Sequence, residues 1–358
     1  IVTQVAGGAA NVQDIYPLGP LQEGILFHHR LSTQGDPYIL PSLFRIKGDQ
    51  AIGEFLEALQ FVINRHDILR TAVLWDSLSV PVQVVYRHVD LPVSWIELDA
   101  GQDALTYMQE LCAPEVQQMN LNQPSLLKLQ IARDPDMEQY FVLLQLHHII
   151  DDATSLKILQ KEIRAYHAGQ SAQLIPPIAY REFVAHALHQ AKHNDAEDYF
   201  QNTLGDVDEP KAPFNLLDVQ GEGSKITVVR EAVPAAVCSQ LRQIAKDMMV
   251  SPAALFHTAW AMVVAGCSGR DDVVFGTVVS GRLQGTVGAE NMLGMFINTL
   301  PIRVKLNSRS CTELVRQVHN SLLGLLPYEQ ASLALAQRCS SLPGGTPLFS
   351  ALLNYRHS

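Results

Sequence analysis

The sequence predicts an α/β protein built from two halves in which strands and helices follow one another in a similar order. Apolar runs of strand-like composition, such as 140–146, are followed by stretches whose apolar residues recur at helical spacing. A break at 169–178, which begins with a glycine and contains Pro176-Pro177, separates the halves. At 358 residues the chain exceeds the usual single-domain size, so one large or two medium-sized domains are expected, and the break favours two.

Composition narrows the class of protein. Hydrophobic residues make up 47% of the chain and charged residues 17%, which is enough to build a sizeable core. The formal net charge of −10, without a basic stripe, argues against nucleic-acid binding. No apolar run approaches the roughly 20 residues that cross a bilayer. The five cysteines are never in CxxC spacing and indicate thiols of a cytoplasmic protein, not disulfides or a zinc site.

The chain opens on Ile1, with neither a methionine nor a signal peptide. We therefore interpret it as a piece of a longer protein. Residues 1–15 are small and polar and are expected to be a linker from an upstream domain. The N-terminal lobe is then expected at 16–175 and the C-terminal lobe at 176–358.

The stretch YPLGPLQEG at 16–24 predicts a helix that begins near Pro20, because proline suits a first helical turn. His28 and His29 follow at the polar end of this helix, and a later glycine, Gly35, is expected to stop it. A second helix is indicated by an apolar stripe at helical spacing, and it runs into the segment RHDILRT, which starts at Arg65. Strand-like runs follow at 72–75, 82–86, 126–132 and 140–146. The last two runs are separated by a short turn, so we expect them to pair.

Two adjacent histidines, His147 and His148, stand where the last of these strands stops and another helix starts. Asp152 or Thr154 could cap that helix. Strand alternation sends the two imidazoles to opposite sides, so one can face a cleft while the other packs. An isolated pair of this kind is usually structural. The acidic residue shortly after this pair favours a functional reading, because it could fix an imidazole or the loop around it.

The second half is expected to repeat the order of elements of the first. A long polar helix is expected from Tyr180 to about Leu204, a strand around Val228 and a helix around 241–244. A further helix begins at Ser251, is nearly all apolar and is therefore expected to be deeply buried. A buried strand from 272 then leaves through a tight turn at 280–282.

The sequence lacks the motifs that mark several common kinds of active site. The chain has no GxxxxGK phosphate loop, no GxSxG nucleophile elbow and no cluster of metal ligands at the usual spacing. A histidine without a serine or cysteine partner favours direct proton transfer to or from a bound substrate over covalent catalysis. Such a base suits the attack of an amine on an already activated acyl group.

The histidine pair, with Asp152 four residues after His148, resembles the HHxxxDG signature of the condensation-domain superfamily of nonribosomal peptide synthetases. Ala153 stands where that signature has glycine. Other family motifs follow in collinear order between Tyr16 and Arg356: YPLxPLQEG at 16–24, RHxxLRT at 65–71 and GxFxNTxxxR at 294–303. Domains of this family normally continue for several tens of residues, so the C-terminal lobe is expected to lack its end.

The resemblance implies a fold, an activity and partners. The fold is two chloramphenicol acetyltransferase-like lobes in a V-shaped pseudo-dimer, with a tunnel between them. The activity is the attack of a carrier-bound amino acid on a carrier-bound aminoacyl or peptidyl thioester. Upstream and downstream peptidyl carrier proteins bring both substrates on 4′-phosphopantetheine arms, and an adenylation domain is adjacent. No directly bound cofactor and no metal are expected, and the partners include neither nucleic acid nor membrane.

The resemblance also implies roles for residues. His148 is the catalytic residue, as base or as the group that orients the amine, and His147 packs in support. Asp152 shapes the loop, and Arg65 is expected to pair with it. The residues expected to line the tunnel or the lobe interface are Ala153, Ser280, Arg282 and Asn298.

A second histidine pair resembles a signature of the dual epimerisation/condensation branch, HH[I/L]xxxxGD. His28, His29, Gly35 and Asp36 fit it, whereas Arg30 departs from it. The dual reading implies that the donor residue is turned from L to D before condensation, with His28, His29 or Asp36 as a second proton carrier. Two alternatives remain: plain condensation without epimerisation, and a silent condensation-like platform that docks a tailoring enzyme or a carrier protein.

Overall fold

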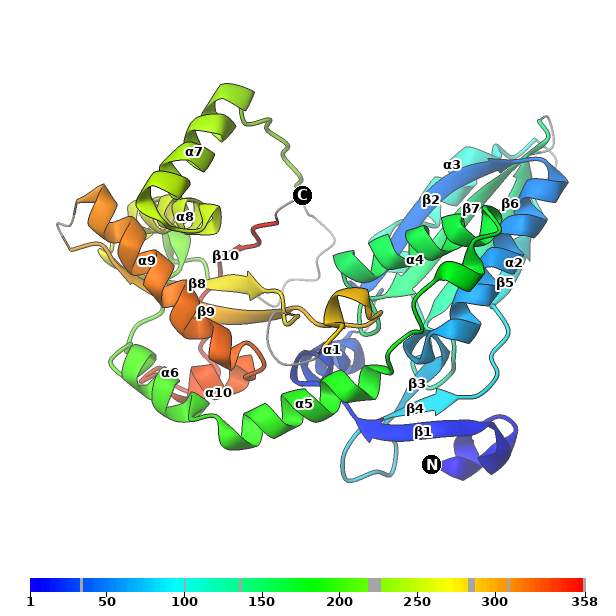
Figure 1. Cartoon of the computed structure of the whole chain (residues 1–358), viewed down its shortest axis with the longest axis horizontal. Coiled ribbons are helices and arrows are strands. Elements are labelled where there is room, and N and C mark those ends of the chain that lie inside the picture. Colours follow the sequence, from blue (N-terminus) through cyan, green and yellow to red (C-terminus); the bar gives the residue numbers. More distant parts are fainter. Residues whose placement is uncertain are drawn as a thin grey trace. The chain divides into compact units, whose positions relative to one another are not determined.

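The computed structural model describes residues 1–32, 35–99, 101–134, 137–217, 227–282, 287–307 and 310–356 (Figure 1). The chain divides into two compact units. Unit 1 comprises Ile1–Ala187 and Gly285–Phe296, and unit 2 comprises Leu188–Gln284 and Ile297–Ser358. The division falls twelve residues later than the expected lobe boundary after residue 175. A short segment of the second half also returns to unit 1.

The main sheet of unit 1 has the strand order β2-β7-β6-β5. Its strands are β2 (Ile39–Lys47), β5 (Val93–Ile96), β6 (Leu127–Asp134) and β7 (Gln139–His147). β6 and β7 pair antiparallel, as the sequence predicts, in a register that sets Leu127 opposite Leu146. Every residue of β7 is buried. Its uninterrupted apolar composition therefore reflects a strand that is covered on both faces.

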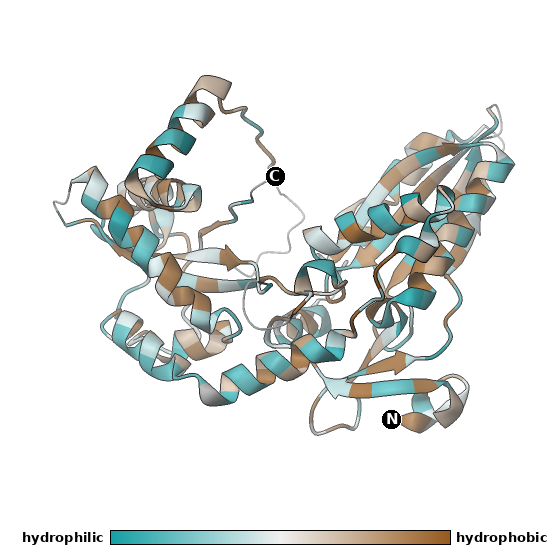
Figure 2. Ribbon diagram, in the orientation of Figure 1, coloured by the Kyte–Doolittle hydropathy of each residue, from teal (hydrophilic) through white to brown (hydrophobic). Residues whose placement is uncertain are grey.

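Three helices accompany this sheet: α2 (Asp49–Arg65), α3 (Ala104–Glu110) and α4 (Ala153–His167). α3 packs Met108 against Phe141 and Leu143. α2 lies against β2 and α4 (Figure 1). Both α2 and α4 carry hydrophobic and hydrophilic residues along their length, as expected for helices with one face on a core (Figure 2).

A second, smaller sheet of unit 1 has the order β1-β4-β3. Its strands are β1 (Val12–Pro17), β3 (Thr71–Leu74) and β4 (Val82–Tyr86), and helix α1 (Pro20–Leu31) follows β1. Residues 1–15, expected to be a linker, thus include most of a strand that pairs with β4.

The sheet of unit 2 has the order β10-β8-β9, formed by β8 (Asp272–Val279), β9 (Asn298–Lys305) and β10 (Leu352–Leu353). Alternate residues of β8 enter two cores. Val273 and Phe275 pack with residues of helices α8 (Pro252–Ser268) and α9 (Cys311–Leu325), whereas Val274 packs with Phe200 and its neighbours. The helices are α6 (Ala196–Leu204), α7 (Ala235–Met248), α8 (Pro252–Ser268), α9 (Cys311–Leu325) and α10 (Leu333–Arg338).

Three expectations for the second half are corrected. The long polar helix is broken into α5 (Tyr180–His193) and α6, and the side chain of Asn194 in the break donates to the carbonyl of Pro327 at 2.8 Å. Val228 lies outside any strand and is 71% exposed, because no described strand pairs with it. α8 is only partly buried: Val263 is 51% exposed despite its apolar setting.

Among the described residues, no single helix is long and apolar enough to cross a membrane; α7 and α8 pass that test only as a pair bent by 107°.

The segment that returns to unit 1 depends on Gly294. Ser155 Oγ lies 2.9 Å from both the N–H and the carbonyl of this glycine. The glycine has φ +152°, and an added Cβ would lie 2.3 Å from the ring of Tyr180. The Tyr180 hydroxyl in turn donates to the carbonyl of Met295.

We expect Gly294→Ala to destabilise unit 1 by about 2 kcal/mol or more, because the fully buried Tyr180 ring has no room to move. The matched control is Gly53→Ala within α2, where nothing lies within 4 Å of the added methyl. That change is expected to be neutral or stabilising by up to about 1 kcal/mol. Denaturant unfolding measures both, and equal effects would contradict the role given to Gly294.

Candidate active site

The end of β7, the turn after it and the start of α4 form the centre of the site. The β2–β7 ladder sets Ile39 opposite His147, and the N–H of His148 donates to the carbonyl of Tyr38 at 2.7 Å. Asp152 caps α4, accepting from the N–H groups of Thr154 at 3.0 Å and Ser155 at 2.8 Å. The sequence left two candidates for the cap of this helix, Asp152 and Thr154. The structure shows Asp152, whose short side chain reaches the N–H groups of the first turn.

His147 is fully buried and structural. Its Nδ1 accepts the N–H of Ile149 at 3.0 Å, so the ring proton sits on Nε2. That nitrogen lies 3.0 Å from Oδ2 of Asp36 and donates to it. Burial lowers the pKa of His147, although the hydrogen bond to Asp36 acts in the opposite direction. The ring is therefore held neutral with a fixed tautomer.

His148 has the opposite tautomer. Its Nδ1 lies 2.7 Å from the carbonyl oxygen of Asp151, which can only accept, so Nδ1 carries the proton. The lone pair of the neutral ring is then on Nε2. No described residue forms a hydrogen bond with this nitrogen, and the side chain is only partly buried. The carbonyl of Asp151 thus fixes the tautomer of His148 and leaves Nε2 available as a base.

Gln22, which the sequence analysis did not single out, links α1 to the histidine turn. It is 1% exposed, and its Nε2 donates to the carbonyl of Ile149 at 2.8 Å. Its Oε1 accepts the N–H of Gly19 at 2.8 Å, which caps α1. The signal was present in the motif YPLGPLQEG, where glutamine is the polar residue on a helix face that is otherwise apolar.

The second histidine pair is split by the fold. His29 places Nδ1 2.5 Å from Oδ2 of Asp36, the oxygen that also accepts from His147. His28 is exposed and meets the hydroxyl of Tyr38 at 3.2 Å. Burial alone would raise the pKa of Asp36, but the hydrogen bonds with His147 and His29 hold it well below its usual range. Asp36 is therefore an ionised bridge between two imidazoles.

Gly35 brings Asp36 to this position. It has φ +66°, and an added Cβ would lie 2.2 Å from the carbonyl oxygen of Pro114. α1 itself ends earlier, at Leu31. The glycine is required by the close approach of the loop to a neighbouring backbone, not as the helix stop that was expected.

His29, Asp36 and His147 bring three donor atoms of metal-ligand type within 4.8 Å of one another. They do not fit a metal ion, because Nε2 of His147 carries a proton while its Nδ1 accepts from the backbone. A ligand needs a free lone pair at that position.

Arg65 pairs with Glu162 and not with Asp152, which corrects the expected contact. Its Nε lies 3.0 Å from Oε2 of Glu162, and the same oxygen accepts from Nε2 of His66 at 3.0 Å. Burial would raise the pKa of Glu162, but the hydrogen bonds from His66 and Arg65 lower it. This ion pair joins α2 to α4 about two turns after α4 begins. Asp152, at the start of α4, instead accepts the N–H groups of the first turn as the helix cap.

Ala153 is the first residue of α4 and is exposed. Its φ is not in the left-handed region. The backbone at this position is helical, so the departure from the family glycine carries no conformational cost here.

The remaining candidates lie in unit 2. Ser280 is exposed, and the next residue, Gly281, has φ +65° and donates to the buried carboxylate of Glu329 at 3.1 Å. Arg282 is partly buried. Asn298 is buried and donates to the carbonyls of Glu329 at 2.9 Å and Ala331 at 2.7 Å. Asn298 thus stabilises the local backbone.

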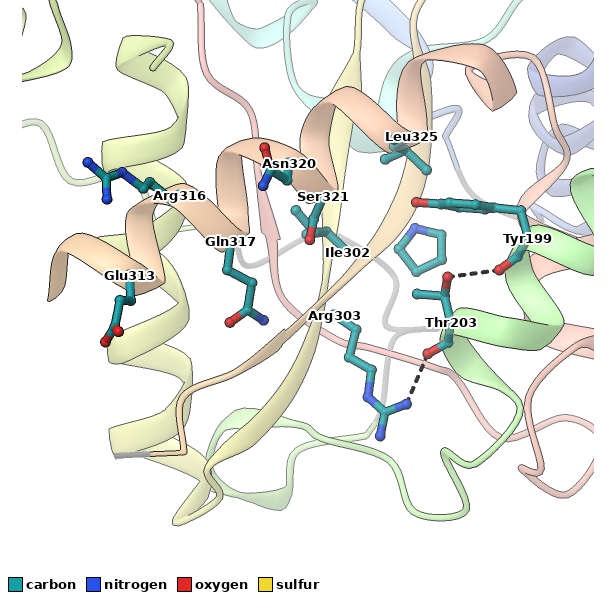
Figure 3. Close-up of a pocket in the computed structure, with 12 residues that line it drawn as sticks. Tyr199, Thr203, Ile302, Arg303, Glu313, Arg316, Gln317, Asn320, Ser321 and Leu325 are labelled. Atoms are coloured by element: carbon teal, nitrogen blue, oxygen red, sulfur yellow. Dashed lines mark hydrogen bonds between the residues drawn. The ribbon is translucent and has the colours of Figure 1, made fainter. Parts of the chain in front are cut away.

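A cavity of about 610 Å³ lies between α6, β9 and α9 in unit 2 (Figure 3). Arg303 lines it, but this guanidinium donates to the carbonyl of Thr203 at 2.9 Å, to Asp272 at 2.9 Å and to Asp206. Its donors are therefore used within the protein. Among the residues described around this cavity there is no histidine or cysteine, so it offers no base or nucleophile comparable to His148.

Comparisons with known proteins identify the family of this chain. A family model described as "Condensation domain" matches residues 12–357. Malpibaldin synthetase from Mortierella alpina is 45% identical over 359 residues, covering 100% of this chain and 6% of that protein. Tyrocidine synthase 3 from Brevibacillus parabrevis is 32% identical over 333 residues, covering 90% of the chain and 5% of that protein. The chain thus spans about one twentieth of these relatives.

Solved structures share the fold. The first condensation domain of the calcium-dependent antibiotic synthetase, in complex with a substrate analogue, has TM-score 0.71 and 19% identity over 96% of this chain and 80% of that one. A four-domain nonribosomal peptide synthetase bound to AMP and glycine has TM-score 0.74 and 19% identity, over 96% of this chain and 27% of that one. The predicted α/β class, with the chloramphenicol acetyltransferase-like fold of these domains, is confirmed.

The buried neutral state of His147 gives a pH dependence. Because its folded-state pKa is lowered, its stabilising contribution is complete above the unfolded value of about 6.5 and is lost as the pH falls. We expect the free energy of unfolding to decline from about pH 7.5 to about pH 5.5, and His147→Gln to flatten that decline. Burial also lowers the pKa of His257, so part of the slope remains. Denaturant unfolding at both pH values measures the change, and an unaltered slope in the variant would contradict it.

Proposed function

Because this chain belongs to the condensation-domain family, we propose that it joins two amino acids in nonribosomal peptide synthesis. The donor is an aminoacyl or peptidyl thioester, and the acceptor is an aminoacyl group. Both arrive on the 4′-phosphopantetheine arms of carrier proteins in the same synthetase, next to an adenylation domain. The names of the two relatives, a synthetase and a synthase, support this assignment.

The observation that carries the proposal is the free Nε2 of His148. The acceptor amine attacks the donor carbonyl carbon, and the C–S bond breaks to give the amide and a pantetheine thiol. His148 takes a proton from the attacking nitrogen as the C–N bond forms and passes it to the leaving thiolate, or it accepts a hydrogen bond that orients the amine. Either role needs Nδ1 protonated, as the bond to the Asp151 carbonyl requires.

The surrounding residues hold this imidazole. His147 and Asp36 fix the end of β7, Gln22 holds the turn through Ile149, and Asp152 fixes the start of α4. Ala153 is exposed in the first turn of α4, where its backbone conformation does not require glycine. We assign these residues to positioning, with His148 as the group that meets the substrate.

A second candidate activity is L-to-D epimerisation of the donor before condensation. The observation that favours it is the contact of His29 with an ionised Asp36, which leaves Nε2 of His29 free to exchange a proton. One histidine would remove the Cα proton, leaving a thioester enolate, and another would return a proton to the opposite face. Of the three second carriers, His29 is favoured over the solvent-exposed His28 and over Asp36, whose oxygens already accept hydrogen bonds.

We expect His148→Gln to lower the rate of dipeptide formation by about 10²–10⁴-fold, the usual contribution of a positioned base. His167→Gln, at the exposed end of α4, is the matched control and is expected to keep full activity. Product is measured with loaded donor and acceptor carrier proteins, and folding is checked by thermal unfolding. Full activity of a folded His148→Gln variant would overturn the assignment.

The configuration of the product separates the finer alternatives. With an L-donor, we expect a D-configured product from the unaltered chain and loss of that product in His29→Gln, while a D-donor is still condensed. Unchanged D-product in the variant would remove His29 from the mechanism. L-product from the unaltered chain would indicate plain condensation, and no product would favour a platform for a tailoring enzyme or carrier protein.

A further inference from the structure

A cavity of about 520 Å³ opens on the surface of unit 1 beside Asp36, the residue that the buried His147 contacts. One side is formed by residues at or shortly after the end of α1, and the other by the segment that leads into β6. Its polar lining residues are His29, Ser32, Asp36, Gln118, Asn120, Gln123, Ser125 and Lys128. The cavity is large enough for a small organic molecule.

The cavity is lined by hydrogen-bond donors that the protein leaves unused. Lys128 donates one hydrogen bond, to the carbonyl of Gln118 at 2.7 Å, and keeps two N–H groups. The side-chain amides of Gln118 and Gln123 have no partner among the described residues. Nε2 of His29 is also unpartnered within that part of the chain.

The carboxylate in the lining is fully occupied. Oδ2 of Asp36 accepts from both His29 and His147, and Oδ1 accepts the N–H of Tyr38 at 3.0 Å. Asp36 therefore cannot serve a cationic ligand. Lys128 is half-buried, and burial lowers its pKa, as happens to an ammonium that lacks a counter-ion. Among the described residues that line the cavity, Lys128 is the cation, and it forms no ion pair with any described residue.

We propose that this cavity binds the phosphate of a small phosphate ester through Lys128 and the side-chain amides of Gln118 and Gln123. Several donors around one cation suit a tetrahedral oxyanion with more than two oxygens. The volume exceeds that of inorganic phosphate, so an organic group fits beside it. The phosphate can come from the pantetheine arm, a source that rests on the proposed function, or from a free metabolite.

Isothermal titration of the whole chain with inorganic phosphate, 4′-phosphopantetheine and pantetheine tests the site. We expect phosphate to bind, and Lys128→Met to weaken it about tenfold or more. Lys128→Arg keeps the positive charge and is expected to retain binding. Its binding would show that Lys128→Met acts by removing the charge and not by disrupting the fold. Lys157→Gln, an exposed lysine on α4, is the control and is expected to bind as the unaltered chain does.

Tighter binding of phosphopantetheine than of phosphate, with none of pantetheine, assigns the arm as the source. Equal binding of phosphate and phosphopantetheine shows that the site recognises the phosphate alone, which supports a free phosphate metabolite over the arm. No phosphate binding, or binding that Lys128→Met leaves unchanged, overturns the proposal. The titration requires no turnover, so its failure is distinct from a failure of the proposed function.

Discussion

The site depends on two backbone groups that fix the protons of adjacent imidazoles. The N–H of Ile149 places the proton of His147 on Nε2, and the carbonyl of Asp151 places that of His148 on Nδ1. Neighbouring residues of the same type are thereby given opposite roles. One donates to a buried carboxylate, and the other keeps a free basic nitrogen. The difference comes from the turn after β7 and requires no difference in the side chains.

Distant parts of unit 1 keep that turn in place. Gln22 reaches it from α1, Tyr38 from the start of β2, and Asp36 from the loop between them. Asp152 fixes the helix that follows, and Ser155 ties the helix to the returning segment at Gly294. The motifs around 16–36 and 147–152 are thus parts of one hydrogen-bonded arrangement. Their spacing along the chain reflects the fold, since each supplies one contact to the same turn.

Local sequence patterns predicted the helices and strands near the site. Contacts between residues far apart in the sequence were harder to predict. The strand–turn–helix around His148 and the pairing of β6 with β7 followed from periodicity. The partner of Arg65 did not, because Asp152 and Glu162 are both acidic residues near the same helix and only packing selects between them. The break at Asn194 depends on a distant carbonyl. The exposure of Val263 depends on what the surrounding elements leave uncovered, which composition does not reveal.

The central claim is the tautomer of His148, and ¹⁵N–¹H correlation spectra of the imidazole rings measure it directly. The His148→Gln and His147→Gln variants assign the two signals. For the neutral rings, we expect a proton on Nδ1 of His148 and on Nε2 of His147. A proton on Nε2 of His148 would contradict it, because the nitrogen proposed to meet the substrate amine would then be a donor and could not accept a proton.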